Sequence, residues 1–338
     1  MSSEQILNEL KATKFGLGLL SFTARPDPYP QSALNETLLA TIKKNLPNKT
    51  FINGGEFYGP NDINVKYVKS FIDSYPDQRQ HLIISIKGAT DIATFTPHGT
   101  KEGIQKSIDN ITSYIPDLDL FEAARLDPTV PVEVTIAAIN DNVDSGKIKG
   151  ISVSEVNANT LRKLAKISKH KIVCAELEFS IFSRDILTNG LAQAAGELDI
   201  PIIAYSPLSR GLLSCSIKST SDLFENDFRK TFDRFTDENL KKNAPIIEFV
   251  EKAAAKKNIT PAQYSLAWVR YWSEKTIDGI KFPKIIDIPS TSSVKRVEEN
   301  FSDIVLTQDE FDEANNFLKG VTVHGLRYNA HAEKLLSQ

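Results

Sequence analysis

The stretch HLIISIKG (residues 81–88) is a continuous apolar run that ends on a lysine and a glycine. A strand with one wet face alternates apolar and polar residues, whereas a continuous run is typical of a parallel strand covered on both faces. Most of seven further short runs along the chain are similarly continuous. They are KFGLGLL (14–20), TFING (50–54), LDLFEAA (118–124), IKGISVS (148–154), KIVCAELEF (171–179), PIIAYSP (201–207) and IIDIPS (285–290).

Segments with the spacing of amphipathic helices separate these runs, for example 104–115 and 132–143. Eight strand-then-helix units predict an α/β fold with a closed (β/α)8 TIM barrel, because eight parallel strands can close without an exposed edge. An open doubly wound sheet is the alternative. The units are evenly spread with no break in composition, which favours one domain over residues 1–338. Its barrel core would span about 14–302, followed by a C-terminal tail at 303–338.

The composition is that of an ordinary globular protein, with 41% hydrophobic and 25% charged residues and a formal charge of -3. The chain has no basic block, so neither nucleic acid nor an anionic membrane is indicated as a partner. Cys174 and Cys215 have no paired spacing, which argues against a disulfide framework and fits a reducing compartment. The first residues lack the layout of a secretory signal. We expect a cytoplasmic protein, monomeric by default.

Reactive side chains stand where the predicted strands end, which is the catalytic end of a TIM barrel. Asn53 and then Tyr58 follow the second strand in FINGGEFYGP (51–60), and Lys87 ends the third. Glu122 has inward parity on the fourth. A free phenol has a pKa near ~10, and a neighbouring ammonium group lowers it. We therefore predict that Tyr58 is a proton donor whose pKa Lys87 lowers.

Five phrases resemble, in order, the aldo-keto reductase superfamily. They are EFYG (56–59), ISIKG (84–88), GISVSEVN (150–157), AYSPLSRGLL (204–213) and IPSTSSVKRVEEN (288–300). Within the superfamily, four further phrases resemble the fungal pyridoxal reductases. They are FINGGEFYGP (51–60), DLFEAARLDP (119–128), SRDILTNG (183–190) and DFRKTFDRF (227–235). The resemblance implies a barrel that binds NADPH over the strand ends and reduces an aldehyde, most plausibly pyridoxal to pyridoxine.

Two positions depart from the superfamily's catalytic set of Asp, Tyr, Lys and His. Asn53 stands at the Asp position and Ala124 at the His position, while Tyr58 and Lys87 are retained. We hypothesise that Glu122 takes over the ionic role of the missing Asp, with Asn53 adding a neutral hydrogen bond. For the missing His, the hydroxyl ortho to the aldehyde of pyridoxal can polarise the carbonyl from within the substrate.

The resemblance also implies the cofactor contacts. Ser154 would bind the nicotinamide carboxamide, and Tyr205 would stack on the ring. Glu155 and Glu176 could accept from the carboxamide, with a pair of solvated acids as an equal alternative. Hydroxyls near a helix N-terminus followed by an arginine suit the 2′-phosphate. The full set is Leu20, Ser21, Ser154, Glu155, Glu176, Tyr205, Ser206, Leu208, Arg210, Ser290, Thr291, Ser292, Arg296, Glu299 and Asn300.

The histidines share no metal-ligand spacing, so no metal is expected. The irregular stretch 214–235 has the length of a lid or mobile segment and could close over the cofactor. Two alternatives to a pyridoxal reductase remain open. One is a general reductase of small aldehydes or ketones. The other is a slow NADPH-binding redox sensor, because both the Asp and the His are missing.

Overall fold

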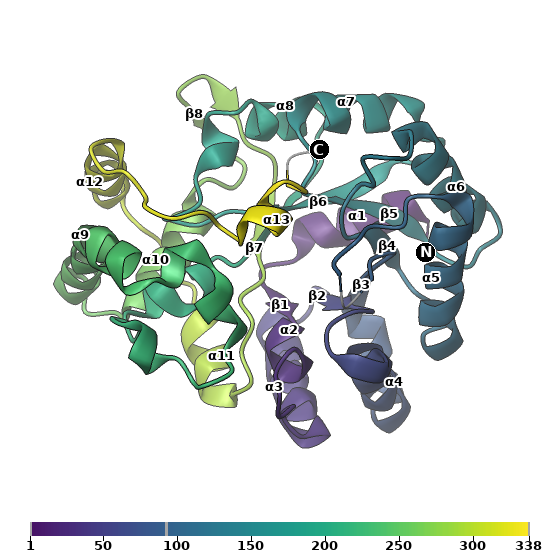
Figure 1. Cartoon of the computed structure of the whole chain (residues 1–338), viewed down its shortest axis with the longest axis horizontal. Helices are drawn as coiled ribbons and strands as arrows, with labels where there is room; N and C mark the ends of the chain where they lie inside the picture. The colour runs from purple at the N-terminus through teal and green to yellow at the C-terminus, as the bar shows by residue number, and fades with distance from the viewer. Residues whose placement is uncertain (1, 92–93, 337–338) are drawn as a thin grey trace.

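The computed structural model describes residues 2–91 and 94–336. Within them, eight parallel strands follow one another in chain order, surrounded by helices (Figure 1). The strands are β1 (Gly16–Gly18), β2 (Thr50–Gly55), β3 (Leu82–Gly88), β4 (Leu120–Ala123), β5 (Gly150–Ser154), β6 (Ile172–Glu178), β7 (Ile202–Tyr205) and β10 (Ile285–Asp287). The predicted TIM barrel is confirmed, and each of the eight apolar runs corresponds to one strand, with β2 ending one residue beyond its run.

The barrel closes between β1 and β10 at two glycines. Gly18 forms a parallel bridge with Ser290, and its amide donates to the carbonyl of Pro289 at 3.4 Å. A Cβ on Gly18 would lie 2.9 Å from the carbonyl oxygen of Ile288, and one on Gly16 would lie 2.6 Å from the Ile288 side chain. These glycines therefore allow the first and last strands to approach each other closely.

Helices form the outer layer, and the periodic segments 104–115 and 132–143 fall on α5 and α6 as predicted. The α-helices are α1 (Ser3–Ala12), α2 (Leu20–Thr23), α3 (Gln31–Asn45), α4 (Ile63–Ser74), α5 (Lys101–Tyr114), α6 (Val132–Asp144), α7 (Ala158–Ile167), α8 (Leu191–Glu197), α9 (Asp237–Lys256), α10 (Pro261–Tyr271), α11 (Val294–Asn300), α12 (Gln308–Lys319) and α13 (Ala330–Glu333). The short 3-10 helices are η1 (Pro60–Asp62), η2 (Pro76–His81), η3 (Asp185–Leu187), η4 (Ser209–Ser214), η5 (Thr220–Asp222), η6 (Phe228–Thr231) and η7 (Asp233–Phe235). A small antiparallel hairpin, β8 (Thr276–Ile277) and β9 (Ile280–Lys281), precedes β10.

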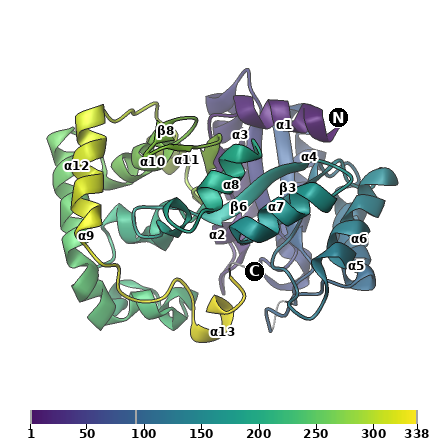
Figure 2. The same ribbon diagram turned by 90° about the horizontal axis from the view of Figure 1, so that it is seen from above.

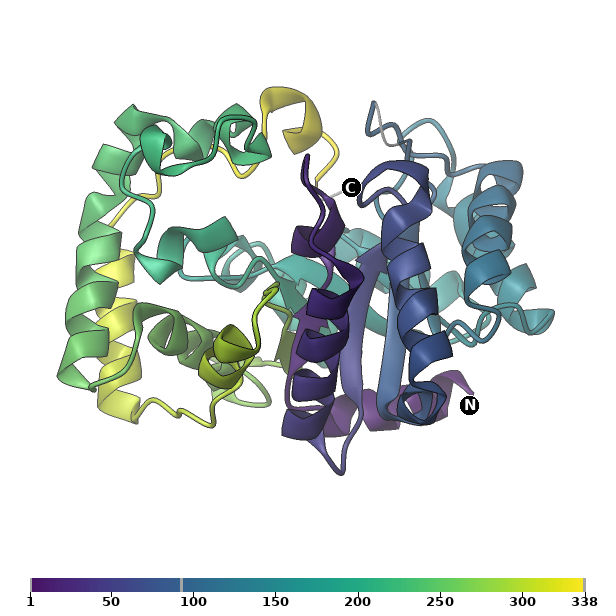
Figure 3. The same cartoon turned by 90° about the horizontal axis from the view of Figure 1, so that it is seen from below.

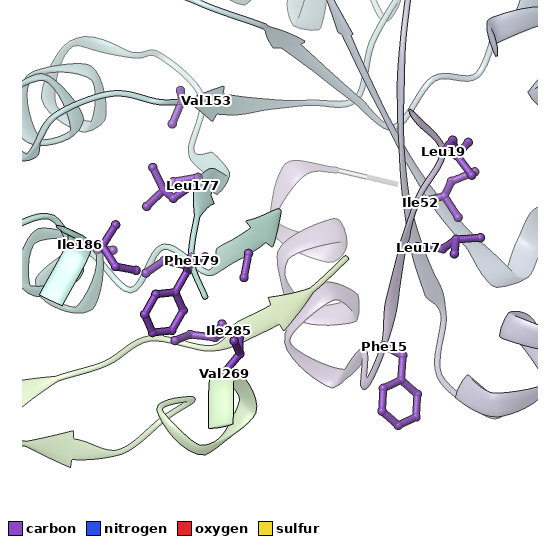
Figure 4. Packing of buried hydrophobic residues seen from close by; sticks show 14 of the residues in the cluster. Phe15, Leu17, Leu19, Ile52, Val153, Leu177, Phe179, Ile186, Val269 and Ile285 are labelled. Atoms are coloured by element: carbon purple, nitrogen blue, oxygen red, sulfur yellow. The ribbon is translucent and has the colours of Figure 1, made fainter. Parts of the chain in front are cut away.

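Two apolar layers hold the barrel together. The larger lies between strands and outer helices, and Figure 4 shows part of it, with Phe179, Val269 and Ile285 close to one another. The smaller lies inside the barrel, where α1 contributes Ile6 and Leu10 to the cluster formed by the inward side chains of the strands. Burying these side chains removes apolar surface from water, which is the main stabilising contribution to such a core.

Helix α1 covers the amino ends of the strands. Its Ser3 hydroxyl donates to the carbonyl of Lys149, just before β5, and its Glu4 pairs with Lys171, just before β6. In Figures 2 and 3, α1 lies at one end of the strands and the C-terminal α13 at the other. The carboxyl ends of the strands, where barrel enzymes carry their chemistry, are therefore on the side of α13.

The C-terminal segment runs back from α12 to α13 along the long stretch after β7 (Figure 2). The Asn243 amide donates to the carbonyl of His324 at 2.9 Å, and the Leu326 amide donates to Asp233 at 3.1 Å. This course brings the tail to the carboxyl end of the barrel. Within the described ranges, none of the helices has both the length and the apolar content that crossing a membrane needs.

Candidate active site

Tyr58 lies just beyond β2, on a turn that folds its ring back over the strand. Its amide donates to the carbonyl of Gly55 at 3.1 Å, and a Cβ on Gly55 would lie only 2.8 Å from the ring. Gly59 continues the turn at a φ of 99°, in the left-handed region that favours glycine. Any larger residue at position 55 would displace Tyr58. The stretch FINGGEFYGP therefore presents a phenol at the catalytic end of the barrel.

A carboxylate from β6 holds Lys87. The Lys87 ammonium forms a buried ion pair with one oxygen of Glu176, and the Asn53 amide donates to the other oxygen at 2.6 Å. The Lys87 nitrogen is 5.7 Å from the centroid of the Tyr58 ring and 5.5 Å from that of Tyr205. The structure thus brings together four of the predicted site residues around one lysine.

Glu122 does not take the place that the sequence suggested. It lies beside Lys87 in the β3–β4 ladder, but its carboxylate accepts a hydrogen bond from Ser152 at 2.5 Å. Its second oxygen is buried and has no hydrogen-bond partner within the described residues. The hypothesis that Glu122 replaces the missing Asp is therefore wrong, and Glu176 holds Lys87. Each Glu176 oxygen accepts one of these bonds, so the side chain is not the solvated acid of the alternative interpretation.

The protonation of the Tyr58–Lys87 pair follows from burial and from the two nearby carboxylates. Desolvation raises the pKa of Tyr58 and Lys87 lowers it, but Glu176 raises it further, so that it reaches about 12. The expectation of a lowered pKa is wrong, because one ammonium does not offset desolvation. Burial lowers the pKa of Lys87, yet Glu176 and Tyr58 together lift it above its usual range. At neutral pH the pair is a neutral phenol beside a charged ammonium.

The carboxyl group of Glu122 is itself protonated over much of the neutral range. Burial, followed by the charge of Glu176, raises its pKa to about 8, against the opposing effects of Lys87 and Ser152. The Cys174 thiol donates to the Ser152 hydroxyl at 3.3 Å, and burial raises the pKa of that thiol well above its usual range. Glu122, Ser152 and Cys174 therefore form an uncharged polar chain inside the barrel.

Arg125 lies at the end of β4, next to Ala124, and was not among the predicted site residues. One guanidinium nitrogen donates to the carbonyl of Ala124 at 2.5 Å and to the Ser154 hydroxyl at 3.4 Å. Its guanidinium carbon lies 5.9 Å from the centroid of the Tyr328 ring. Sequence reasoning missed Arg125 because it considered only residues of inward parity, although the phrase DLFEAARLDP contains it.

The tail reaches the strand ends through Arg327 and Tyr328. Arg327 donates to the two carboxylate oxygens of Glu155 at 3.3 and 2.9 Å, so Glu155 is ion-paired rather than free to meet a carboxamide. The Tyr328 hydroxyl lies 3.0 Å from the hydroxyl of Tyr205. Tyr205 therefore stands at the catalytic end as predicted, with a tail residue bonded to it. Nothing in the sequence pattern indicated Arg327 or Tyr328.

Glu178, at the end of β6, organises the turn that contains Ser206, Leu208 and Arg210 of the predicted cofactor set. Arg210 donates to its two oxygens at 3.2 and 3.0 Å, and Arg234 lies 3.9 Å away. Burial raises the pKa of Glu178, but Arg210, Arg327 and Arg234 hold it below its usual value. In the same turn Ser206 has a φ of 48°, and Leu208 precedes η4.

At the other side of the barrel mouth, Leu20 opens α2 and Ser21 meets the end of β10. The Ser21 and Ser290 hydroxyls are 2.6 Å apart, and Ser290 also donates to the carbonyl of Gly18 at 2.7 Å. Thr291 is buried and accepts from the amide of Ser293 at 3.3 Å. The hydroxyls of Ser290 and Thr291 thus serve barrel closure and a local turn.

Basic and aromatic side chains gather next to Ser292. The Arg25 guanidinium lies 4.2 Å from the centroid of the Tyr29 ring, and its Nε is buried without a hydrogen-bond partner among the described residues. A hydrogen bond with Ser292 lowers the pKa of Tyr29 most, and Arg25 and Arg296 lower it further. The predicted residues Ser292 and Arg296 are therefore joined by Arg25 and Tyr29, which the sequence reasoning missed.

Glu299 and Asn300, the last two of the predicted cofactor residues, end α11. The carbonyl of Glu299 accepts from Gln263 at 3.2 Å, and the carbonyl of Asn300 accepts from Arg270 at 2.7 Å. The Asn300 side chain is buried. Among the described residues there is no group of three or more His, Cys, Asp or Glu side chains that could hold a metal ion.

Comparisons with known proteins identify the family of this chain. The sequence model of the aldo/keto reductase family matches residues 14–319. A Saccharomyces cerevisiae (strain ATCC 204508 / S288c) protein, provisionally named a pyridoxal reductase, is 40% identical over 346 aligned positions, covering 97% of this chain and 99% of that protein. A Schizosaccharomyces pombe (strain 972 / ATCC 24843) protein, provisionally named pyridoxal reductase 2, is 34% identical and covers 98% of this chain and 99% of that protein.

The fold agrees with that of a solved structure. The crystal structure of a thermostable aldo-keto reductase with the inhibitor epalrestat superposes with a TM-score of 0.65. The match covers 90% of this chain and 94% of the other at 22% identity, which compares the folds alone. The sequence match, by contrast, extends over nearly the whole barrel. The chain belongs to the aldo/keto reductase family.

Proposed function

We propose that the protein is an NADPH-dependent aldehyde reductase whose substrate is pyridoxal. The observation that carries this proposal is the Tyr58 phenol beside Lys87, with Glu176 as the counter-ion of the lysine. When bound, NADPH would supply a hydride to the aldehyde carbon. Tyr58 gives its proton to the aldehyde oxygen, and the product is the alcohol, pyridoxine.

The protonation states support this role for Tyr58. With a pKa of about 12, the phenol carries its proton at neutral pH and can give it to an alkoxide, which is the stronger base. The ammonium of Lys87 then stabilises the phenolate that remains. Since Glu176 and Asn53 fix the lysine, it needs no rearrangement when the charge appears, which is the condition for electrostatic preorganisation.

The residues present also fit NADPH. Arg25 has a buried Nε without a partner in the described chain, and it lies beside Tyr29, which bonds Ser292 and feels the charge of Arg296. Two guanidinium groups and two hydroxyls suit the 2′-phosphate that distinguishes NADPH from NADH. At the other end, Ser154 and Tyr205 would hold the nicotinamide.

The substrate assignment rests on the relatives, two of which carry provisional names as pyridoxal reductases and align over nearly their full length. The departures at Asn53 and Ala124 fit this group, as the sequence resemblance implies. We also propose that barrel and tail act as one domain, because the tail supplies Tyr328 to Tyr205. Action in the cytoplasm and as a monomer stays a prediction.

The test is NADPH oxidation measured with a panel of aldehydes that contains pyridoxal, pyridoxal 5′-phosphate and pyridine-4-carboxaldehyde. We expect the highest kcat/KM with pyridoxal and a lower value with NADH than with NADPH. A higher kcat/KM for simple aldehydes than for pyridoxal would mean that the protein is a general aldehyde reductase. A preference for NADH would overturn the role of the Arg25 cluster.

One observation favours a second candidate, a slow NADPH-binding redox sensor. Both the Asp and the His of the family set are absent, at Asn53 and Ala124. The ion pair between Glu176 and Lys87 argues against this candidate, since it restores a carboxylate at the lysine. Tight binding of NADPH without turnover of any aldehyde in the panel would support the sensor.

A further inference from the structure

The carboxyl end of the barrel holds more guanidinium groups than carboxylates to pair with them. Glu178 engages Arg210 and lies near Arg234, and Glu155 engages Arg327. Arg125 differs from these three arginines, because its hydrogen bonds in the described chain go to neutral oxygens, on Ala124 and Ser154. The cluster as a whole therefore has an excess of positive charge.

Arg125 also lies beside Ser154, which the resemblance predicted to hold the nicotinamide. It stands between the end of β4 and Ser154 on β5, and Tyr328 lies against it. Burial lowers the pKa of Arg125, but Tyr205, Tyr328, Glu155 and Tyr58 together raise it above its usual range. It therefore lies in the same part of the barrel mouth as the proton donor, and the residue as a whole is half-buried.

A half-buried guanidinium without a carboxylate partner is costly unless a ligand supplies the negative charge. Arginine suits such a ligand, because its planar group presents several donors in a fixed geometry. Ala124, at the family's His position, contributes only a methyl group, so the charged group nearest to that position along the chain is Arg125.

We propose that Arg125 is a specificity-determining residue that recognises an ionised hydroxyl ortho to the aldehyde of the substrate. This proposal rests on the proposed function and goes beyond it by naming the substrate group and its partner. The 3-hydroxyl of pyridoxal ionises readily because the ring nitrogen withdraws electrons. Paired with Arg125, that oxygen orients the aldehyde toward Tyr58. A substrate whose hydroxyl only polarised its own carbonyl would not require Arg125.

The test is a cycle of two enzymes and two substrates. Wild type and Arg125→Gln are each measured with pyridoxal and with its 3-O-methyl ether, which cannot ionise at that oxygen. We expect the wild type to prefer pyridoxal by roughly 10- to 100-fold in kcat/KM, the size of one charge-assisted hydrogen bond. In Arg125→Gln the preference should fall to within about 3-fold of unity, mostly through KM, and Arg125→Lys should restore part of it.

The control is Arg162→Gln, which removes an arginine of α7 that pairs with Glu197 on the outer helices. It should leave the preference unchanged. A wild-type enzyme without the preference, or an Arg125→Gln enzyme that keeps it in full, would overturn the proposal. Unfolding midpoints of the variants separate a loss of recognition from a loss of fold.

The outcome for Arg125 can be separated from that for the proposed function. If neither substrate is turned over, the same ratio is read from calorimetric binding of the two compounds to the NADP+-loaded protein. A 10-fold weaker binding of the ether to wild type, absent in Arg125→Gln, would support the recognition by Arg125 while rejecting the reductase. Equal binding of both compounds to wild type would reject the recognition itself.

Discussion

Glu176 on β6 is the counter-ion of Lys87 on β3, and the same carboxylate accepts a hydrogen bond from Asn53 on β2. This relationship explains why residue 53 is an amide. A carboxylate there would place a second negative charge against Glu176, whereas an amide donates to it. In this chain the carboxylate that pairs with Lys87 comes from residue 176 on β6.

The first prediction is that Glu176→Gln loses both stability and activity. It would leave the Lys87 ammonium buried without a counter-ion, which costs about 3–5 kcal/mol in the free energy of unfolding. We expect kcat to fall by roughly 100-fold or more, because the lysine no longer has a fixed position. Denaturant unfolding and steady-state kinetics measure the two losses.

A second variant makes this prediction specific. Asn53→Asp alone should also be destabilising, because two carboxylates would share one lysine. The double variant Asn53→Asp/Glu176→Gln has one carboxylate and one amide again, so it should recover part of both losses. Additive losses in the double variant would show that the two positions do not exchange roles.

The sequence was sufficient for the barrel but only partly so for this ion pair. Continuous apolar runs report burial on both faces, and eight of them leave few other folds. Parity along a strand indicated that the side chain of Glu122 points inward, and it lies beside Lys87 as expected. Parity does not report which of several inward carboxylates a long lysine side chain reaches. That choice depends on Asn53 and Ser152, which hold Glu176 and Glu122 in different places.

The tail illustrates a second limit. Tyr328 bonds Tyr205 although 123 positions separate them in the chain, and neither periodicity nor strand ends predict such a contact. Arg25 was missed for a related reason, since it lies in a loop just beyond the short helix α2. Loop side chains are positioned by tertiary contacts, such as the Tyr29 ring under Arg25, and not by local pattern.

The next prediction concerns Tyr58. In Tyr58→Phe we expect kcat for pyridoxal to fall by roughly 100- to 10,000-fold, because the proton donor is lost. The dissociation constant for NADPH should change less than about 2-fold, since the ring remains. Tyr75→Phe, which alters a tyrosine after α4, is the matched control and should keep full activity. Retained turnover in Tyr58→Phe would place the donor elsewhere.

The free energy of unfolding should depend on pH because the buried carboxyl group of Glu122 titrates. Its pKa is about 8 in the folded protein and near ~4.3 when unfolded, so the folded state keeps a proton that the unfolded chain releases. Stability from this group is therefore greatest below the unfolded pKa and is lost as pH rises toward 8. Between pH 6 and pH 9 the loss amounts to roughly 3 kcal/mol at about 1.4 kcal/mol per pKa unit.

Glu122→Gln removes this titration while it keeps a group that can bond Ser152. The variant should therefore gain stability relative to wild type as pH rises from 6 to 9, measured by denaturant unfolding at each pH. Glu248→Gln, on the exposed face of α9, is the control and should follow the wild-type curve. A pH-independent difference between Glu122→Gln and wild type would mean that Glu122 is ionised throughout.

The last prediction addresses the cofactor through Arg25. Its Nε is buried and without a partner in the described residues, so a phosphate would supply the missing acceptor. Arg25→Gln should raise the dissociation constant for NADPH by roughly 10-fold, the value of one charge-assisted hydrogen bond, and leave that for NADH within about 2-fold. Arg162→Gln is the control, because Arg162 is half-exposed and pairs with Glu197 on the outer helices. If Arg25→Gln weakens the binding of NADPH and of NADH equally, Arg25 contacts a part of the molecule that the two cofactors share. The 2′-phosphate must then be bound by Arg296 and Ser292 without Arg25.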